Sequence, residues 1–285
     1  MCDDGSPTEM FGAPCHPSFA SEKYRELSHK AMITFLNHVE GRYGDSIVDY
    51  QAENGFGGEW LTFNSFREVR PGAPPPNKFG VEDYSPPAQP AFRRWLKGKY
   101  GSVERLCRAW GDPKVTFETA PLPKEVERYS STHRIFFDPA VSRRVADCFS
   151  FFNEMVAHVL LENCRSIKEL TNRKKIVGAS YGYLWRNFPN LSVVHSGHLG
   201  LAKILRSPDV DFIASPYKYD NKQIGPRIIH RLCRKPSPCM ASFTSTKWTR
   251  RPTFTNGSGG GEARSTIPRI GRRPRDCSSV ITAMP

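Results

Sequence analysis

The 285-residue sequence has no C-x-x-C pair and no long apolar run, and only 38% of its residues are hydrophobic. Its eight cysteines are scattered, and without paired spacing they give a zinc site no support. Scattered cysteines are typical of a reducing compartment, which favours a cytoplasmic location. No apolar run approaches the ~20 residues of a membrane span, and the first ten residues do not resemble a signal peptide. We therefore expect no metal, no cofactor and no membrane partner.

Acidic residues are scarce in one part of the chain only. Residues 226–285 hold 12 Lys and Arg against 2 Asp and Glu, whereas residues 1–225 hold 29 against 26. The formal net charge of +13 therefore belongs mostly to the tail. Clustered basic charge is typical of nucleic-acid binding, but this tail has few aromatic residues among its basic ones. We rank nucleic-acid binding last and expect no nucleic-acid partner.

Residues 21–40 form the first predicted helix. Ser21 is suited to cap its amino terminus, and the glycines at 41 and 44 are suited to close it. Apolar side chains at helical spacing predict one buried face, made of Tyr24, Leu27, Ala31, Phe35 and Val39.

The pattern up to residue 225 then alternates strands with helices. It predicts a strand at 46–51, two short helices within 91–110 that are separated at Gly101 and Ser102, a long helix at 146–171, a strand at 174–181, a helix at 198–206 and a strand at 209–216. Such alternation is typical of α/β proteins with a parallel sheet of βα units, closed as a barrel or open. Functional side chains should then follow the carboxyl ends of the strands.

The loops after these three strands carry carboxylate, amide and aromatic side chains. They span residues 52–60, 181–185 and 215–219. Aromatic rings can stack on the C–H faces of sugars while amides and carboxylates bond the hydroxyl groups, so the set favours a carbohydrate site. A phosphate site would call for Lys or Arg beside a Gly-rich turn, and here Glu59 follows that turn. The candidate sugar contacts are Asn54, Trp60, Tyr181, Tyr183 and Tyr217.

Structural interpretations of the same residues stay open. Glu59 could cap a following helix or lie in solvent, and Tyr181 and Tyr183 could be ordinary core residues. Trp95 and Trp110 lie inside helical periods, so they are predicted to pack between helices.

One block of the sequence resembles a known family. Residues 92–111 read F-R-R-W-L-K-G-K-Y-G-S-V-E-R-L-C-R-A-W-G, which closely resembles a segment of glycoside hydrolase family 42, the β-galactosidase family. Similar features continue in F-F-N-E-M-V-A-H-V, in Y-G-Y at 181–183 and in the segment from S-G-H-L-G to I-A-S-P at 196–216. The similarity runs from about residue 19 to residue 225 and is nearest to a divergent branch.

The resemblance implies a (β/α)8 TIM barrel of which this chain holds about strands 4–6, so that it begins in mid-barrel. It also implies an acid/base glutamate after strand 4 and a nucleophile after strand 7. Asn54-Gly55 stands where the main family carries Asn-Glu, so Glu59 is the acid/base candidate, by similarity to G-E-W in the divergent branch, and Glu53 is the reserve. A retaining mechanism needs two carboxylates about 5–5.5 Å apart, and at best one is present here.

The tail carries no pattern for strand 7. The DNA that encodes the tail can also be translated in another reading frame, whose codons begin at the third base of each present codon. From Cys239 onward, that frame permits the sequence H-G-K-L-Y-L-N-E-V-D-T, which resembles the family's strand-7 segment. Because the genetic code is degenerate, many amino-acid sequences can be obtained by such a translation. Two amino acids of this segment, however, are the only ones that the present residues allow at their positions. The hypothesis is a frame slip near Gly225 or Pro226, with no nucleophile in the present frame and a disordered tail.

Two domains are therefore expected: a partial barrel at 1–225 and a basic tail at 226–285. The predicted function is a β-galactosidase-like glycoside hydrolase that acts on a β-galactoside or related β-glycoside. The chain itself is expected to be an inactive fragment that folds poorly. The alternative is a carbohydrate-binding protein without catalysis, and the oligomeric state is not fixed by the sequence.

Overall fold

The computed structural model describes Gly5 and residues 9–10, 13–14, 18–55, 57–62, 83–129, 138–183, 196–214 and 282–283. Its main sheet is parallel, in the order β5-β4-β3-β6. These strands are β3 (Asp49–Ala52), β4 (Ile176–Ser180), β5 (Phe212–Ala214) and β6 (Thr282–Ala283). A separate antiparallel pair joins β1 (Glu9–Met10) and β2 (Ala13–Pro14). The prediction of a parallel sheet built from βα units is confirmed.

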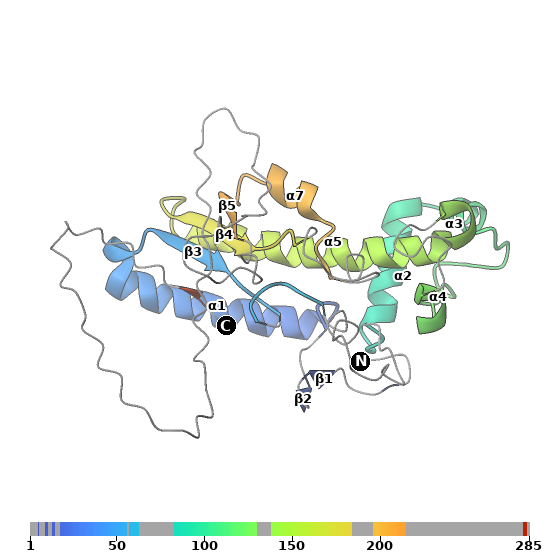
Figure 1. Ribbon diagram of the computed structural model, residues 1–285, viewed down its shortest axis with the longest axis horizontal. Coiled ribbons are helices and arrows are strands. Elements are labelled where there is room, and N and C mark those ends of the chain that lie inside the picture. The colour runs from blue at the N-terminus through green and yellow to red at the C-terminus, as the bar shows by residue number, and fades with distance from the viewer. Residues whose placement is uncertain are drawn as a thin grey trace, which may run out of the picture.

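Helices connect the three principal strands. The helices are α1 (Glu22–Tyr43), α2 (Ala88–Tyr100), α3 (Val103–Trp110), α4 (Glu125–Tyr129), α5 (Pro139–Leu170) and α7 (Leu201–Arg206), with a 3-10 turn η1 (Gly44–Ser46) after α1. Figure 1 shows α1 and α5 running alongside the sheet, and α2, α3 and α4 gathered near one end of α5. The sheet lies toward the other end of that helix.

The cap predicted for α1 is confirmed, and its predicted buried face is correct in part. The Ser21 side chain accepts a hydrogen bond from the amide of Tyr24. Of the predicted face, Val39 is buried and Tyr24 and Phe35 are partly buried against the core, whereas Leu27 is 52% exposed and Ala31 is exposed. The buried residues that the prediction missed are Met32 and Leu36. Packing against α5 and the sheet, not apolar spacing alone, selects the buried stripe.

The predicted break between α2 and α3 is confirmed. Gly101 adopts a φ of 71°, a left-handed value that favours glycine, and its amide bonds the Lys97 carbonyl. The Ser102 side chain then caps α3 by accepting from the amide of Arg105. Helix α5 begins earlier than the predicted residue 146, because Asp138 caps it through the amide of Ala140 and Pro139 occupies its first position.

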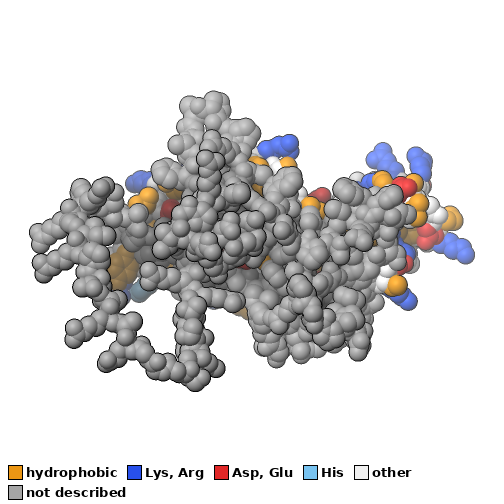
Figure 2. Space-filling model, in the orientation of Figure 1, with side chains coloured by type: hydrophobic (Ala, Val, Ile, Leu, Met, Phe, Trp, Pro, Cys, Tyr) orange, Lys and Arg blue, Asp and Glu red, His pale blue; other side chains and the backbone are white. Residues whose placement is uncertain are grey.

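The described core consists of two groups of buried side chains. The sheet cluster contains residues of α1, β3, β4, α7 and the carboxyl-terminal half of α5. The helical cluster contains residues of α2, α3, the segment 115–122 and the amino-terminal half of α5. Helix α5 has 32 residues with a kink at Ser142, and the long part after the kink contributes to both clusters. Charged side chains of both signs are interspersed on the surface at the α2–α3 end (Figure 2).

Most of the predicted tail lies outside the described residues, and so does Tyr217. Within that tail, β6 pairs with β3 in parallel, with Thr282 opposite Gln51 and Ala283 opposite Ala52. This short strand was not predicted from the sequence.

Candidate functional site

The carboxyl ends of β3 and β4 hold a buried polar group. Glu53 directly follows β3 and is only 3% exposed. Its carboxylate accepts a hydrogen bond from the Ser180 hydroxyl at 2.8 Å and another from the Gln51 amide. The same Gln51 amide nitrogen donates to the Ser180 oxygen at 2.5 Å. Strand pairing thus brings residues more than 120 positions apart into one hydrogen-bonded cluster around the reserve glutamate.

A Gly-rich turn covers the Glu53 carboxylate. Gly58 has a φ of 71°, and a Cβ at that position would lie 2.2 Å from the Glu53 Oε2 atom. The turn is closed by hydrogen bonds from the Gly58 amide to the Gly55 carbonyl and from the Trp60 amide to the Asn54 carbonyl. A side chain at Gly58 would therefore displace the carboxylate or open the turn.

Glu59 lies in this turn and is partly exposed, in contrast to Glu53. Its backbone carbonyl accepts a hydrogen bond from the His198 Nε2 atom at 2.9 Å. Immediately after it, Trp60 is fully buried, donates from its indole nitrogen to the Ala52 carbonyl and stacks on Phe19. Glu59 is therefore the more accessible of the two predicted carboxylates.

His198 was not predicted from the sequence, although it lies in the S-G-H-L-G segment. Its side chain is fully buried, and its Nδ1 atom accepts from the Tyr183 amide at 3.1 Å. Because the Glu59 carbonyl can only accept, the ring proton is on Nε2, which makes the imidazole neutral. Burial lowers the pKa of His198 to about 3.

The two predicted tyrosines that the structure describes are buried around this histidine. Tyr181 is fully buried, stacks on the His198 ring at 4.4 Å and donates its hydroxyl to the Gly197 carbonyl. Burial raises the pKa of the Tyr181 hydroxyl. Tyr183 is 4% exposed and contacts the same ring edge-on at 4.8 Å. Their rings thus contact the imidazole and leave little surface to solvent.

Asn54, the predicted amide contact, is bonded to α1. Its Oδ1 atom accepts from the Tyr24 hydroxyl at 2.5 Å, and its Nδ2 atom donates to the Ser28 hydroxyl at 3.1 Å. Asn54 is also 4% exposed. These contacts fix the start of the Gly-rich turn against the first helix.

The described residues contain no group of three or more His, Cys, Asp and Glu side chains arranged to hold a metal ion. No helix in the same described ranges has the length and apolar character needed to span a membrane.

The block of sequence at 92–111 converges on one buried carboxylate of α5. Asp147 is 1% exposed and accepts from Lys99 at 2.8 Å, Tyr100 at 2.6 Å and Trp110 at 2.8 Å. Arg143 adds an ion pair at 3.3 Å. Burial and the Asp147 hydrogen bond raise the pKa of Tyr100 to about 12. The block therefore joins α2 and α3 to α5.

The two tryptophans of this block pack as predicted. Trp95 donates to the Glu154 carboxylate at 2.8 Å and stacks on Phe92, and Trp110 also stacks on Phe92. Next to Glu154 in α5, the Asn153 side chain accepts from the Leu199 amide at 2.8 Å. Helix α5 thereby links the helical cluster to the segment that carries His198.

Comparison with known proteins gives a family match in the same region. Residues 76–194 match the glycoside hydrolase family 42 model, described as β-galactosidase. Over 103 residues the chain is 32% identical to β-galactosidase BgaA of a Thermus species and 31% identical to a β-galactosidase of Thermus thermophilus. Each alignment covers 35% of this chain and only 12% of the relative.

A solved structure of another protein shares the fold. The catalytic domain of β-amylase from Paenibacillus polymyxa superposes with a TM-score of 0.53 at 15% identity, over 75% of this chain and 51% of that one. A β-galactosidase from the psychrophilic Marinomonas ef1 gives a TM-score of 0.43 at 19% identity, over 73% and 26% respectively. The predicted fold class, a partial (β/α)8 barrel, is confirmed. The family match and the two relatives support the assignment of a partial chain that is similar to glycoside hydrolase family 42.

Proposed function

We propose that the Glu59 turn is a carbohydrate site for a β-galactoside or related β-glycoside, with Glu59 as the general acid/base of a β-galactosidase-like hydrolase framework. The observation that carries the proposal is the position of Glu59 at the carboxyl edge of the parallel sheet, partly exposed while its backbone is held by His198. In barrels of βα units, reacting side chains are placed at this edge. A carboxyl group there can protonate a glycosidic oxygen.

We further propose that this chain does not turn over substrate. A retaining reaction needs two carboxylates, one protonated and one ionised, on either side of the sugar. Glu53 is enclosed by Gln51, Ser180 and Gly58, so it is not free to attack a sugar in this conformation. Among the described residues of this edge, no second carboxylate is placed to attack the sugar.

Hydrolysis of a nitrophenyl β-galactoside tests both parts of the proposal. We expect no turnover above background, together with saturable binding of a non-hydrolysable thio-β-galactoside in calorimetry. The Glu59→Gln variant should weaken that binding about tenfold, since a hydrogen bond to a charged group contributes about 1.5–3 kcal/mol. The Glu53→Gln variant is the matched control and should change binding less.

The outcomes separate the two glutamates. Loss of binding in Glu53→Gln but not in Glu59→Gln would move the assignment to the reserve residue. Turnover by the wild-type chain that either substitution abolishes would refute the proposed inactivity. The absence of any galactoside binding would refute the sugar site.

A carbohydrate-binding protein without catalysis is the second candidate. The enclosure of Glu53 favours it, because Glu59 is then the accessible carboxylate among the described residues that follow β3. Trp60, Tyr181 and Tyr183 are buried here, so stacking on a sugar in this conformation would depend on Tyr217, outside the described residues. Binding that is saturable but indifferent to Glu59→Gln would support this function over the hydrolase framework.

The frame slip stays a proposal for the tail. It is supported by the reread codons from Cys239 onward, which permit a strand ending in glutamate across Thr246 and Lys247. Sequencing the DNA for Ile224 to Thr255 tests it. Codons that spell H-G-K-L-Y-L-N-E in the other frame would support the slip, and a Thr246 codon that does not end in G would exclude it.

A further inference from the structure

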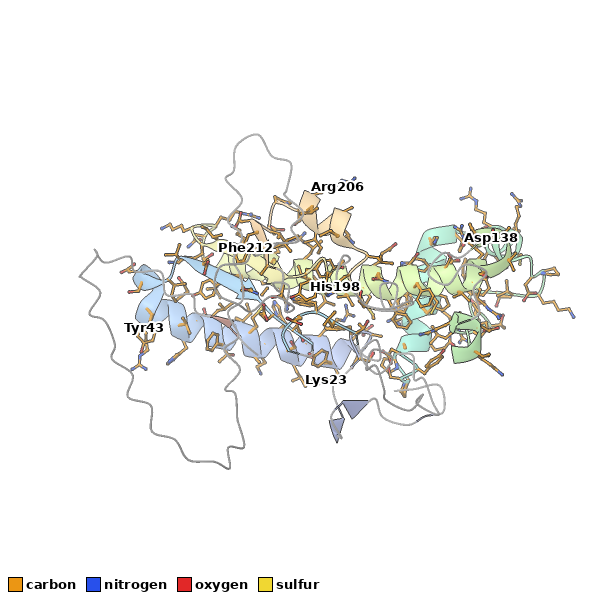
Figure 3. All side chains as sticks on the ribbon, viewed as in Figure 1. Lys23, Tyr43, Asp138, His198, Arg206 and Phe212 are labelled. Atoms are coloured by element: carbon orange, nitrogen blue, oxygen red, sulfur yellow. The ribbon has the colours of Figure 1, made fainter. Side chains whose placement is uncertain are left out.

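We propose that His198 is a positioning residue that orients the Glu59 peptide for sugar binding by bridging the ends of two neighbouring strands. The inference deepens the proposed function and rests on it. Figure 3 shows His198 between α1 and α5. Its two ring nitrogens bond two different segments: Nδ1 accepts from the Tyr183 amide after β4, and Nε2 donates to the Glu59 carbonyl after β3.

The imidazole itself is held rigidly. Its ring is fully buried and packed between Tyr181 at 4.4 Å and Tyr183 at 4.8 Å. The backbone on its carboxyl side is fixed by the bond from the Leu199 amide to Asn153 of α5. A donor held by packing and by its own hydrogen bonds can define the position of the group that it contacts.

The contact acts on the backbone of the residue proposed to touch sugar. The Trp60 amide bonds the Asn54 carbonyl, and the Thr62 amide bonds the Ser196 carbonyl, so neighbouring points of the turn are also tied down. His198 acts on the Glu59 carbonyl, and the orientation of that peptide sets the direction in which the carboxylate projects. The histidine touches no substrate in this account, because it works through Glu59.

Two substitutions of His198 each keep one of the two hydrogen bonds of the imidazole ring and remove the other. In His198→Asn the amide oxygen can replace Nδ1 as acceptor for Tyr183, but the side chain is too short to reach Glu59. In His198→Gln the amide nitrogen can reach the Nε2 position and donate to the Glu59 carbonyl. The Gln variant is therefore the conservative one for the proposed role, and the Asn variant is its matched control.

Amide hydrogen exchange of residues 58–62 and affinity for the thio-β-galactoside are measured on both full-length variants. We expect His198→Asn to speed exchange of this turn about tenfold and to weaken affinity by a similar factor, as loss of one buried hydrogen bond would do. His198→Gln should stay within about threefold of wild type in both readouts. Equal effects in the two variants, or unchanged exchange in His198→Asn, would overturn the proposal.

The combined results of the exchange and affinity measurements distinguish a failure of this inference from a failure of the proposed function. Faster exchange with unchanged affinity would overturn the role of His198 and leave the sugar site standing. Faster exchange in a chain that binds no galactoside at all would refute the sugar site, while the backbone contact of His198 would stand. If neither variant folds, the ¹⁵N imidazole spectrum of the wild type decides: protonated Nε2 with bare Nδ1 is expected, and the opposite tautomer would overturn the bridge.

Discussion

The helical cluster and the carboxyl edge of the sheet both bury polar groups, but they do so with different chemistry. In the helical cluster, the Asp147 carboxylate is surrounded by two cationic side chains and two aromatic donors. At the sheet edge, Glu53 is bonded by the neutral side chains of Gln51 and Ser180, and the nearby imidazole of His198 is also neutral.

The difference shows where the sequence resemblance is informative. The block at 92–111, which resembles the family most closely, uses its polar side chains to join three helices. The proposed chemistry lies in the short turn after β3, where the resemblance implies that Asn54-Gly55 replaces the Asn-Glu of the main family. Similarity in the block therefore supports the fold more strongly than it supports catalysis.

The largest expected effect is in the helical cluster. Asp147→Ala should destabilise the chain by about 3–5 kcal/mol, because it removes the buried charged acceptor shared by three side-chain hydrogen bonds from α2 and α3, and one hydrogen bond to a charged group contributes about 1.5–3 kcal/mol. Urea unfolding measures this loss. Glu154→Ala removes the exposed acceptor of Trp95 and should cost less than about 1 kcal/mol. Similar losses in the two variants would contradict the central role of Asp147.

Substitutions on the buried face of α1 are expected to give the next largest loss of folding stability. Leu36 is fully buried, so Leu36→Ala should destabilise by about 2–5 kcal/mol. Leu27 is 52% exposed, so Leu27→Ala should stay within about 0.5 kcal/mol of wild type. Thermal or urea unfolding distinguishes them, and a larger loss in the Leu27 variant would restore the face predicted from the sequence.

The Gly-rich turn offers a matched glycine pair. Gly57 and Gly58 both have left-handed φ values, 62° and 71°, but only a Cβ at Gly58 would strike Glu53. Gly57→Ala should therefore cost about 1–2 kcal/mol from backbone strain alone. Gly58→Ala should cost at least about 1 kcal/mol more, because the Glu53 hydrogen bonds must break. Equal losses in unfolding experiments would mean that the turn does not press on the carboxylate.

A pH dependence is expected from His198, with no loss of stability above about pH 6.5 and a loss that grows as the pH falls. Its pKa is lowered to about 3 in the folded chain, so between about pH 6.5 and pH 3 the unfolded chain binds a proton that the folded chain does not. Stability from this group is complete above pH 6.5 and falls with decreasing pH by up to about 1.4 kcal/mol per unit. Wild type should lose stability faster than His198→Gln from pH 7 to pH 4 in urea unfolding, and parallel curves would contradict a buried neutral imidazole.

Local signals made much of the fold predictable. Gly101 and Ser102 act within one turn of the chain, and β4 and β5 lie in mostly apolar stretches of sequence, so these elements follow from the sequence. The buried face of α1 follows only in part, because apolar residues occur on more than one stripe and packing against α5 selects between them.

Long-range contacts account for what the sequence did not reveal at the site. The sequence could propose Glu53, Asn54, Glu59 and Trp60 as candidates because they are consecutive or nearly so after one strand, and their roles stay predictions. His198 contacts Glu59 across 139 positions, and no local pattern marks a histidine whose partner is a distant backbone carbonyl. The predicted contact Tyr217 lies outside the described residues, and its role stays a prediction.

The most direct test of the contrast between the two regions is a galactoside titration of the ¹⁵N-labelled chain followed by NMR. The account predicts saturable shift changes in the amides of residues 57–62 and 181–183, with the amides of α2 and α3 unchanged. Shift changes centred on α2 and α3, or none at saturating ligand, would contradict the assignment of the sugar site to the sheet edge.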